Sequence, residues 1–346
     1  MTAEPLIWHS RPSLGVEEEQ AAARVIRSGM LIGGQETRRF AATLGARFPG
    51  ADVVLASSGR SALIGALKSL GLPAGSGVVV PTYVCDAVIW AISAAGLRPV
   101  LCDVGPAWLV MPETVAAALQ PGCGAILLPP PFGIVQSAAP FRQFGLPIIA
   151  DICQANPLVD LSPDDAGDIV VMSFHPTKFI TAGGGGAAIS GRDRYGAALL
   201  DRQAADWEAA PFTEFQAAMG LEQLAKIDQF TAHRRRLYER YSKAIAPELL
   251  APIEAARGSE AGHLLRMPIR LRQGTAAGHF ARFADRGILA RHGVDNLAHR
   301  RTGLDDALFP NAVQALDDTL SVPFYPALDD AAAFRVAEAL GDILEV

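Results

Sequence analysis

The stretch Ile169-Val170-Val171-Met172-Ser173-Phe174-His175-Pro176-Thr177-Lys178 decides the fold of this chain and the chemistry that it can support. Its apolar first part predicts a buried strand, because successive apolar residues leave no polar face for solvent. The strand ends near Ser173 and presents Lys178 a few residues later. The glycines from Gly183 to Gly186 then predict a turn in which the backbone passes close to another group.

Lys178 is a candidate nucleophile. Partial desolvation disfavours the ammonium form of a lysine and leaves an amine that can form a Schiff base. Structural alternatives are a solvated surface lysine and an ordinary tight turn at the glycines. Asp151 favours the chemical interpretation, because it ends another apolar run that begins at Pro147. A lysine and a positioned acid are the minimum that a protein supplies to use pyridoxal 5'-phosphate.

The composition predicts a globular protein with two lobes. The chain has 346 residues, of which 50% are hydrophobic and 19% charged, so it can bury a large core. A net charge of -6 gives no reason to expect nucleic acid as a partner. We also expect no membrane span, no secretion signal and no metal site. The four cysteines lack Cys-x-x-Cys spacing and predict reduced, buried thiols in a cytoplasmic protein.

Apolar runs separated by helical segments dominate the first half of the chain. They predict an α/β fold, in which a three-layer α/β/α arrangement surrounds a mainly parallel sheet. The expected strands are residues 53–56, 78–81, 99–103, 125–128, 147–151 and 169–172, and the expected helices are residues 17–27, 37–47, 61–70 and 86–95.

The pattern changes after Gly191. Residues 215–241 predict one long helix or a kinked pair that connects the lobes. A strand over residues 266–271 and helices over 278–286 and 330–344 predict a smaller C-terminal α+β lobe. We therefore predict an arm and large cofactor-binding domain over residues 1–240 and a small domain over residues 241–346.

A candidate phosphate site lies at Ser57-Ser58-Gly59-Arg60-Ser61, between a strand and a helix. Free backbone N–H groups and the helix dipole favour an anion there. The structural alternative is a simple N-cap, in which Ser58 or Ser61 begins the helix. Ligands of parallel sheets bind at the carboxyl ends of strands, where Asp151 and Lys178 are also expected.

Each further candidate also has a structural alternative. Asp151 could be an N-cap, Ser173 a core hydroxyl bonded to backbone, and Gln154 a polar loop residue. If the ligand is pyridoxal phosphate, a carboxylate in contact with its ring nitrogen keeps that nitrogen protonated. The attraction is roughly 4 kcal/mol at an effective dielectric of 20.

The chain resembles the DegT/StrS-type sugar aminotransferases, a branch of the fold type I pyridoxal-phosphate enzymes. The resemblance runs from residues 12–15 and 28–31 to residues 320–326, and residues 58–63, Asp151 with Gln154, and residues 173–178 are its most specific parts. It implies that Lys178 forms the Schiff base and Asp151 pairs with the pyridinium. Gln154 would lie beside the phenolic oxygen, and Ser58, Gly59, Arg60 (through its backbone) and Ser173 would form the phosphate cradle.

The chain departs from the family at several positions. Cys85 stands where an aromatic ring usually covers the cofactor, and Tyr83 could substitute for it. Residues 209–212 replace an Asn-Tyr-Arg-Met segment that reaches the neighbouring subunit. Gly184 replaces a glutamate and Asn156 a histidine. These changes predict an active cofactor with an unusual acceptor.

The resemblance implies a ping-pong aminotransferase that moves nitrogen from glutamate or glutamine to a keto-sugar in a homodimer, and the expected keto-sugar is linked to a nucleotide. One alternative is a pyridoxal enzyme acting on a non-sugar ketone. A sugar dehydratase is disfavoured, because that lineage usually replaces the lysine by histidine. Another alternative is a degenerate cofactor-binding protein without transaminase activity. A nicotinamide dehydrogenase and a hydrolase lack their Gly-x-Gly-x-x-Gly and Gly-x-Ser-x-Gly motifs.

Overall fold

The large lobe is built around a seven-stranded sheet. The computed structural model describes residues 5–159, 161–162, 164–191, 195–206, 211–256 and 261–344. The strands lie in the order β1-β7-β6-β5-β4-β2-β3. Their bounds are β1 (Ala51–Ala56), β2 (Gly77–Pro81), β3 (Arg98–Cys102), β4 (Cys123–Leu128), β5 (Ile148–Asp151), β6 (Ile169–Ser173) and β7 (Gly186–Gly191). All strand pairs are parallel except those that β7 makes with β1 and β6, so the predicted mainly parallel sheet is confirmed.

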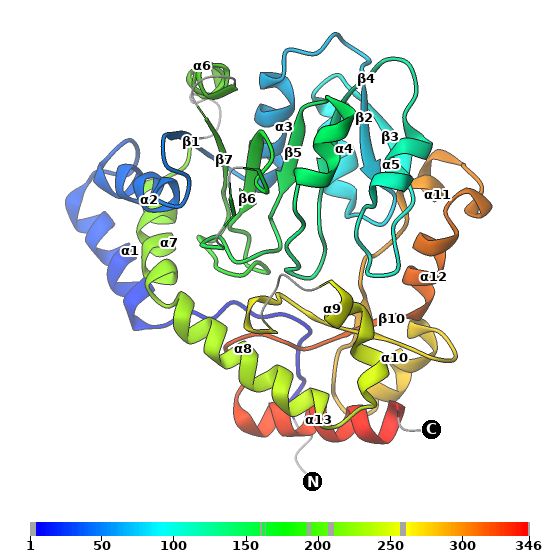
Figure 1. The fold of residues 1–346 in the computed structure, drawn as a ribbon. Coiled ribbons are helices and arrows are strands. Elements are labelled where there is room, and N and C mark those ends of the chain that lie inside the picture. Colours follow the sequence, from blue (N-terminus) through cyan, green and yellow to red (C-terminus); the bar gives the residue numbers. More distant parts are fainter. Residues whose placement is uncertain are drawn as a thin grey trace.

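Helices cover both faces of this sheet (Figure 1). In β6, Ile169 and Val171 join the apolar cluster on one face, whereas Val170 and Met172 join the cluster on the other. Because side chains alternate along a strand, an uninterrupted apolar run such as β6 needs cover on both sides. One face is covered by α3 (Gly59–Ser69), α4 (Asp86–Ala94) and α6 (Ala197–Asp206), the opposite face by α2 (Gln35–Gly45) and α7 (Glu214–Ala225), and α5 (Pro112–Ala118) packs on β3.

The N-terminal arm contacts both lobes. Ile7 pairs with the backbone around Ile288, with N···O distances of 2.8 and 3.0 Å. The helix α1 (Val16–Ser28) then packs on α7 and ends at Gly29, whose φ of 67° is left-handed. The helix predicted over residues 17–27 is therefore confirmed, and glycine is required at its end because a side chain disfavours this conformation.

The connector is a kinked pair of helices. The helix α7 ends at Ala225 and α8 (Ile227–Ser242) begins after Lys226, which interrupts the helical geometry. Figure 1 shows α8 running from the large lobe to α13 (Asp330–Leu344). The second of the two predicted alternatives is thus correct. The domain boundary predicted after residue 240 falls inside α8 and stays a prediction.

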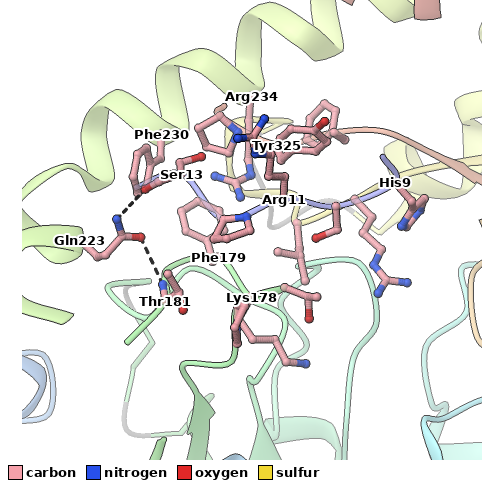
Figure 2. A pocket seen from close by; sticks show the side chains of 18 residues that line it. His9, Arg11, Ser13, Lys178, Phe179, Thr181, Gln223, Phe230, Arg234 and Tyr325 are labelled. Carbon is pink, nitrogen blue, oxygen red and sulfur yellow. Dashed lines mark hydrogen bonds between the residues drawn. The ribbon is translucent and has the colours of Figure 1, made fainter. Parts of the chain in front are cut away.

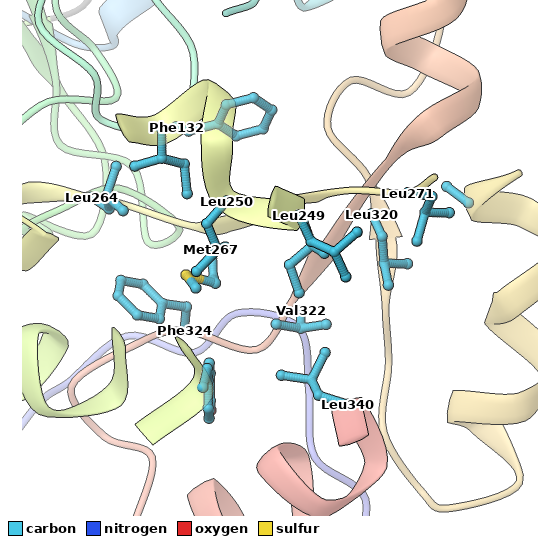
Figure 3. Packing of buried hydrophobic residues seen from close by; sticks show 14 of the residues in the cluster. Phe132, Leu249, Leu250, Leu264, Met267, Leu271, Leu320, Val322, Phe324 and Leu340 are labelled. Carbon is cyan, nitrogen blue, oxygen red and sulfur yellow. The ribbon is translucent and has the colours of Figure 1, made fainter. Parts of the chain in front are cut away.

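The smaller lobe is an α+β unit around a three-stranded antiparallel sheet of order β8-β10-β9. Its strands are β8 (Met267–Arg270), β9 (Arg291–His292) and β10 (Thr319–Val322), and its other helices are α9 (Ala251–Ala255), α10 (Ala276–Ala284), α11 (Ala298–Thr302) and α12 (Pro310–Asp318). Short 3-10 helices span Ala139–Phe144, Pro247–Leu250, Ala261–His263 and Asp306–Leu308. Figure 3 shows Phe132 of the large lobe packing with the core of the small lobe.

The predicted state of the cysteines is only partly correct. All four are free thiols, but Cys102 is the buried one, whereas Cys85 is exposed and Cys123 and Cys153 are half-buried. Cys85 is exposed because it follows β2 in a loop, immediately before α4, instead of lying in the strand. Within the described ranges, no helix has the length and apolar character needed to cross a membrane.

A buried carboxylate joins two helices that are far apart in the sequence. Glu214 is 3% exposed and accepts hydrogen bonds from the backbone N–H groups of Gly34, Glu36 and Thr37 at 2.8–3.0 Å. Glycine at the N-cap of α2 offers no side-chain acceptor, so Glu214 from α7 satisfies these N–H groups instead. Burial acts to raise the pKa of Glu214, but the hydrogen bonds from Thr37, Glu36 and Gly34 outweigh it and lower that pKa.

We expect Glu214→Ala to lower the free energy of unfolding by about 2 kcal/mol at neutral pH, because three N–H groups lose their acceptor. The pKa of Glu214 is lower in the folded state, so this stabilisation is present above the ordinary value of 4.5 and is lost as the pH falls through the folded pKa. Urea denaturation at several pH values measures it. Glu222→Ala, which removes an exposed ion pair with Arg24, is the control and should cost less than about 1 kcal/mol. Equal losses in the two variants would contradict this role.

Candidate active site

A cavity of about 490 Å³ opens at the carboxyl ends of the parallel strands. Its wall includes Ser58, Cys85, Asp151, Ser173 and Lys178. This volume lies within the range of roughly 300–1,000 Å³ that is typical of small-molecule sites. The predicted convergence of the loops after β1, β2, β5 and β6 is therefore observed in the structure.

Asp151 and Lys178 reach this cavity from neighbouring strands. Asp151 ends β5 and is in register with Val171 of β6, and Lys178 follows β6 in a turn in which its N–H donates to the His175 carbonyl at 2.9 Å. Asp151 is 6% exposed, and its Oδ1 accepts the Cys153 N–H at 3.0 Å. This hydrogen bond orients the carboxylate of Asp151. Lys178, in the turn after β6, is half-buried.

The loop after β1 approaches the end of β6 closely. Ser58 is the N-cap of α3, where its Oγ accepts the Ser61 N–H at 3.0 Å, so the N-cap interpretation is confirmed. A Cβ on Gly59 would lie 2.6 Å from the Cβ of Ser173. The start of α3 and Ser173 therefore line the same wall of the cavity, the kind of surface at which a helix N-terminus can bind an anion.

The glycine turn needs glycine for two reasons. Gly183, Gly184 and Gly185 have φ values of 71°, 153° and 97°, which side chains disfavour. A Cβ on Gly185 would also collide with the ring of Phe212. Phe212 stacks on Phe40 with ring centroids 5.6 Å apart. Phe212, one of the residues 209–212 that depart from the family motif, is therefore a core residue under the glycine turn. Ala209 and Ala210 of the same departure lie outside the described residues.

Burial controls the titrating groups around the cavity. Desolvation by the surrounding walls raises the pKa of the Cys85 thiol, although its surface is accessible from the open cavity. Burial also raises the pKa of Cys153 well above its ordinary value. Burial, and then the charge of Lys178, lower the pKa of His175. Both thiols are therefore protonated at neutral pH, and His175 is neutral.

Tyr83 and Gln154 do not line this cavity. Tyr83 is 1% exposed and packs beside Phe132, with ring centroids 6.5 Å apart. The Oε1 of Gln154 accepts the Phe132 N–H at 3.0 Å. Packing between the lobes thus engages Tyr83, and a backbone hydrogen bond engages Gln154. Their contacts with a ligand stay predictions.

The cavity wall also contains residues for which the sequence motifs predict no role. Cys153 and His175 both line it, although each stands next to a predicted site residue in the sequence. Their position two residues from Asp151 or Ser173 is the signal that could have identified them. The guanidinium of Arg60 lies 4.9 Å from the centre of the Trp90 ring, and the role of its backbone in a phosphate cradle stays a prediction. Asn156 accepts the Leu158 N–H at 2.9 Å and is 5% exposed, so it stabilises a turn.

Over the described ranges, no three His, Cys, Asp or Glu side chains form a group that could hold a metal.

Solved structures share this architecture over almost the whole chain. The aminotransferase TlmJ from Streptoalloteichus hindustanus superposes with a TM-score of 0.82 at 24% identity, covering 98% of this chain and 99% of TlmJ. The PLP form of the sugar aminotransferase Spr1654 from Streptococcus pneumoniae gives 0.83 at 19% identity, with 98% and 99% covered. The protein therefore has the α/β fold of the fold type I aminotransferases.

The family follows from the sequence comparisons. The chain belongs to the DegT/DnrJ/EryC1/StrS aminotransferase family, whose model matches residues 12–200 and 209–341. It is 29% identical over 373 residues to a dTDP-4-dehydro-2,3,6-trideoxy-D-glucose 4-aminotransferase of Saccharopolyspora spinosa, covering 97% of this chain and 96% of the relative. It is 30% identical over 290 residues to an L-glutamine:2-deoxy-scyllo-inosose aminotransferase of Streptoalloteichus tenebrarius, covering 73% and 68%. The resemblance on which the sequence analysis rested is confirmed.

Gly59→Ala should destabilise the protein by about 1–3 kcal/mol, because the new Cβ forces the start of α3 away from Ser173. The control is Gly65→Ala in the same helix, where a Cβ meets no atom within 4 Å. That change should stabilise the helix by about 0.5–1 kcal/mol. Denaturant unfolding of both variants provides the test. A Gly59→Ala variant as stable as Gly65→Ala would show that this close approach is not required.

Proposed function

We propose that this protein is a pyridoxal-5'-phosphate-dependent aminotransferase that moves an amino group from glutamate or glutamine to a keto-sugar by a ping-pong mechanism. One observation carries the proposal: Lys178, the buried Asp151 and the anion site at Gly59 and Ser173 line one cavity. Family membership supports the reaction type.

The cavity residues fit the cofactor. The close approach of Gly59 to Ser173 leaves backbone N–H groups and hydroxyls around a space in which a phosphate could lie. Ser58, Gly59, the backbone of Arg60 and Ser173 would hold the phosphate, Asp151 the ring nitrogen, and Lys178 the aldehyde. The bound cofactor supplies an electron sink for the carbon from which the proton is removed.

The protein groups supply positioning and proton transfer. Asp151 is held by the Cys153 N–H, so its carboxylate keeps one orientation toward the ring nitrogen of the cofactor. Lys178 Nζ would move a proton from the α-carbon of the amino donor to C4′ of the cofactor, acting first as base and then as acid. In the acceptor half-reaction it would move a proton in the opposite direction, from C4′ to the carbon that receives the amino group. Cys85 would border one face of the cofactor, where its protonated thiol is neither a strong base nor a strong nucleophile.

A nucleotide-linked keto-sugar is the acceptor that we favour. The relative from Saccharopolyspora spinosa, which the chain matches over 97% of its length, is named for a dTDP-linked keto-sugar. A cyclic ketone without a nucleotide is the second candidate, because the relative from Streptoalloteichus tenebrarius is named for 2-deoxy-scyllo-inosose, with L-glutamine as the donor. The exposed thiol at Cys85 and the altered segment at residues 209–212 support an acceptor that differs from the usual one.

We also infer a cytoplasmic homodimer. The free thiols Cys85 and Cys153 support a reducing compartment. Exposed apolar side chains at Met30, Leu31 and Trp90, which are 54%, 47% and 54% exposed, support contact with a second subunit. Neither the compartment nor the subunit is needed for the reaction test.

The test measures each half of the reaction separately. Glutamate or glutamine, added to the cofactor-loaded protein without acceptor, should bleach its visible absorption and release one keto acid per site. A keto-sugar nucleotide or a keto-cyclitol should then restore the absorption, and the one that does so identifies the acceptor. Lys178→Ala should lose both the absorption of the covalently bound cofactor and turnover, while far-UV circular dichroism stays unchanged. A band that no donor bleaches would indicate a degenerate cofactor-binding protein, and an unchanged spectrum in Lys178→Ala would refute the assignment.

Asp151→Asn should retain cofactor binding but slow the half-reaction with glutamate by roughly a hundredfold or more. The amide cannot replace the attraction of roughly 4 kcal/mol that holds a proton on the ring nitrogen. Stopped-flow absorbance measures the rate. Asp86→Asn is the control, because Asp86 pairs with Arg301 on the exposed surface, and it should react within a few-fold of the wild type. If Asp151→Asn reacts equally fast, Asp151 is not the partner of the ring nitrogen.

A further inference from the structure

A second, much smaller cavity lies on the other side of the Lys178 loop. It measures about 20 Å³. Its lining includes the N-terminal arm with Arg11 and Ser13, the helix α8 with Arg234, and the loop with Lys178 and Phe179. Gln223 and residues 265–266 and 324–326 complete it. Figure 2 shows Arg234 reaching from α8, and Ser13 and Arg11 from the arm, above the loop that carries Lys178.

Arg234 is a buried cation at this cavity, and the described lining offers no carboxylate to pair with it. Its side chain is 2% exposed, and neither Nε nor Nη1 has a hydrogen-bond partner in the described part of the chain. Its guanidinium lies 4.1 Å from the centre of the Phe179 ring, which stabilises the charge but accepts no hydrogen bond in the guanidinium plane. Burial lowers the pKa of Arg234 to about 9. Two buried donor nitrogens without an acceptor are rare in a folded protein and indicate a missing partner.

Ser13 supplies a second unpaired group at the same place. Its Oγ is buried and has no partner among the described residues, whereas its carbonyl accepts Gln223 Nε2 at 2.8 Å. Gln223 in turn accepts the Thr181 N–H at 3.2 Å (Figure 2). The backbone of Ser13 is thus fixed, and its hydroxyl can donate into the cavity together with Arg234.

The charge around the cavity is positive. Arg11, Lys178, Arg234 and Arg266 line it, and the described lining contains no carboxylate. His9 also lines it, and burial together with Arg266 and Arg291 lowers the pKa of His9 to about 3, so this imidazole is neutral and adds no charge. A buried charge is normally paired, and the partner missing here must be negative.

We propose that Arg234 and Ser13 bind a small monovalent inorganic anion of chloride size in this cavity. The volume favours a small ligand. A cavity needs roughly 10–15 Å³ to hold one water, so about 20 Å³ has room for one atom-sized occupant. The charge favours a halide over water, because water leaves the guanidinium uncompensated.

The bound anion would connect the N-terminal arm, the helix α8 and the lysine loop. Arg234 belongs to the connector helix, Ser13 to the arm, and Phe179 follows Lys178 directly. An anion held by the first two fixes the Phe179 ring on which Arg234 stacks. The anion would therefore hold the lysine loop from outside the large cavity. Of the residues assigned to the cofactor, Lys178 alone lines the small cavity.

The test is thermal unfolding of the full chain while sodium chloride or bromide replaces sodium gluconate at constant ionic strength. The midpoint of the wild type should rise by about 2 °C or more with either halide, because a ligand of the folded state stabilises it. Gluconate is too large for the cavity. Arg234→Met keeps much of the side-chain volume and should abolish the halide dependence. The control Arg236→Met removes an exposed arginine of the same helix and should keep it.

Bromide crystallography tests the site even if Arg234→Met does not fold. Crystals of the wild type grown in sodium bromide should show an anomalous peak within hydrogen-bonding distance of Arg234 and Ser13, and Ser13→Ala should weaken it. No peak, or an equal halide dependence in wild type and Arg234→Met, would overturn the proposal. Because neither readout measures turnover, failure of the proposed reaction would leave this result unaffected.

Discussion

The close approach of three backbone segments at the end of β6 is the constraint on which the site depends. A Cβ on Gly59 would meet Ser173, and a Cβ on Gly186 would lie 2.6 Å from the backbone of Gly59. The antiparallel return of β7 beside β6 and β1 produces this crowding, because the glycine turn must close where α3 begins. The resulting surface presents N–H groups and hydroxyls in place of side-chain bulk, which is what an anionic group requires.

Contacts between distant segments hold the surroundings of this surface in place. Glu214 caps α2 from α7. Lys226, at the kink between α7 and α8, donates to Glu18 of α1 at 2.8 Å. Glu18 is 3% exposed, so this ion pair is shielded from solvent, unlike the surface pairs of the chain. These contacts therefore tie the arm and the connector helices to the large lobe around the lysine loop.

The two cavities on either side of the lysine loop differ in chemistry. The large one combines Asp151 with Lys178 and protonated thiols, whereas the small one combines Arg234, Arg266 and Arg11 with no described carboxylate. Lys178 belongs to both walls.

The sequence alone determined the sheet class, six strands of the large sheet, and the placing of Asp151 and Ser173 at strand ends with Lys178 shortly after Ser173. It could do so because apolar periodicity and strand-end position are local properties, and because the family motifs are contiguous. It did not place β7 between β1 and β6. Tertiary structure alone decided that Tyr83 packs between the lobes with Phe132. It also decided that Cys85 is exposed and that Arg234 and Ser13 line the same cavity. Each of these depends on contacts between residues far apart in the chain, and no local pattern encodes which surface such a side chain will face.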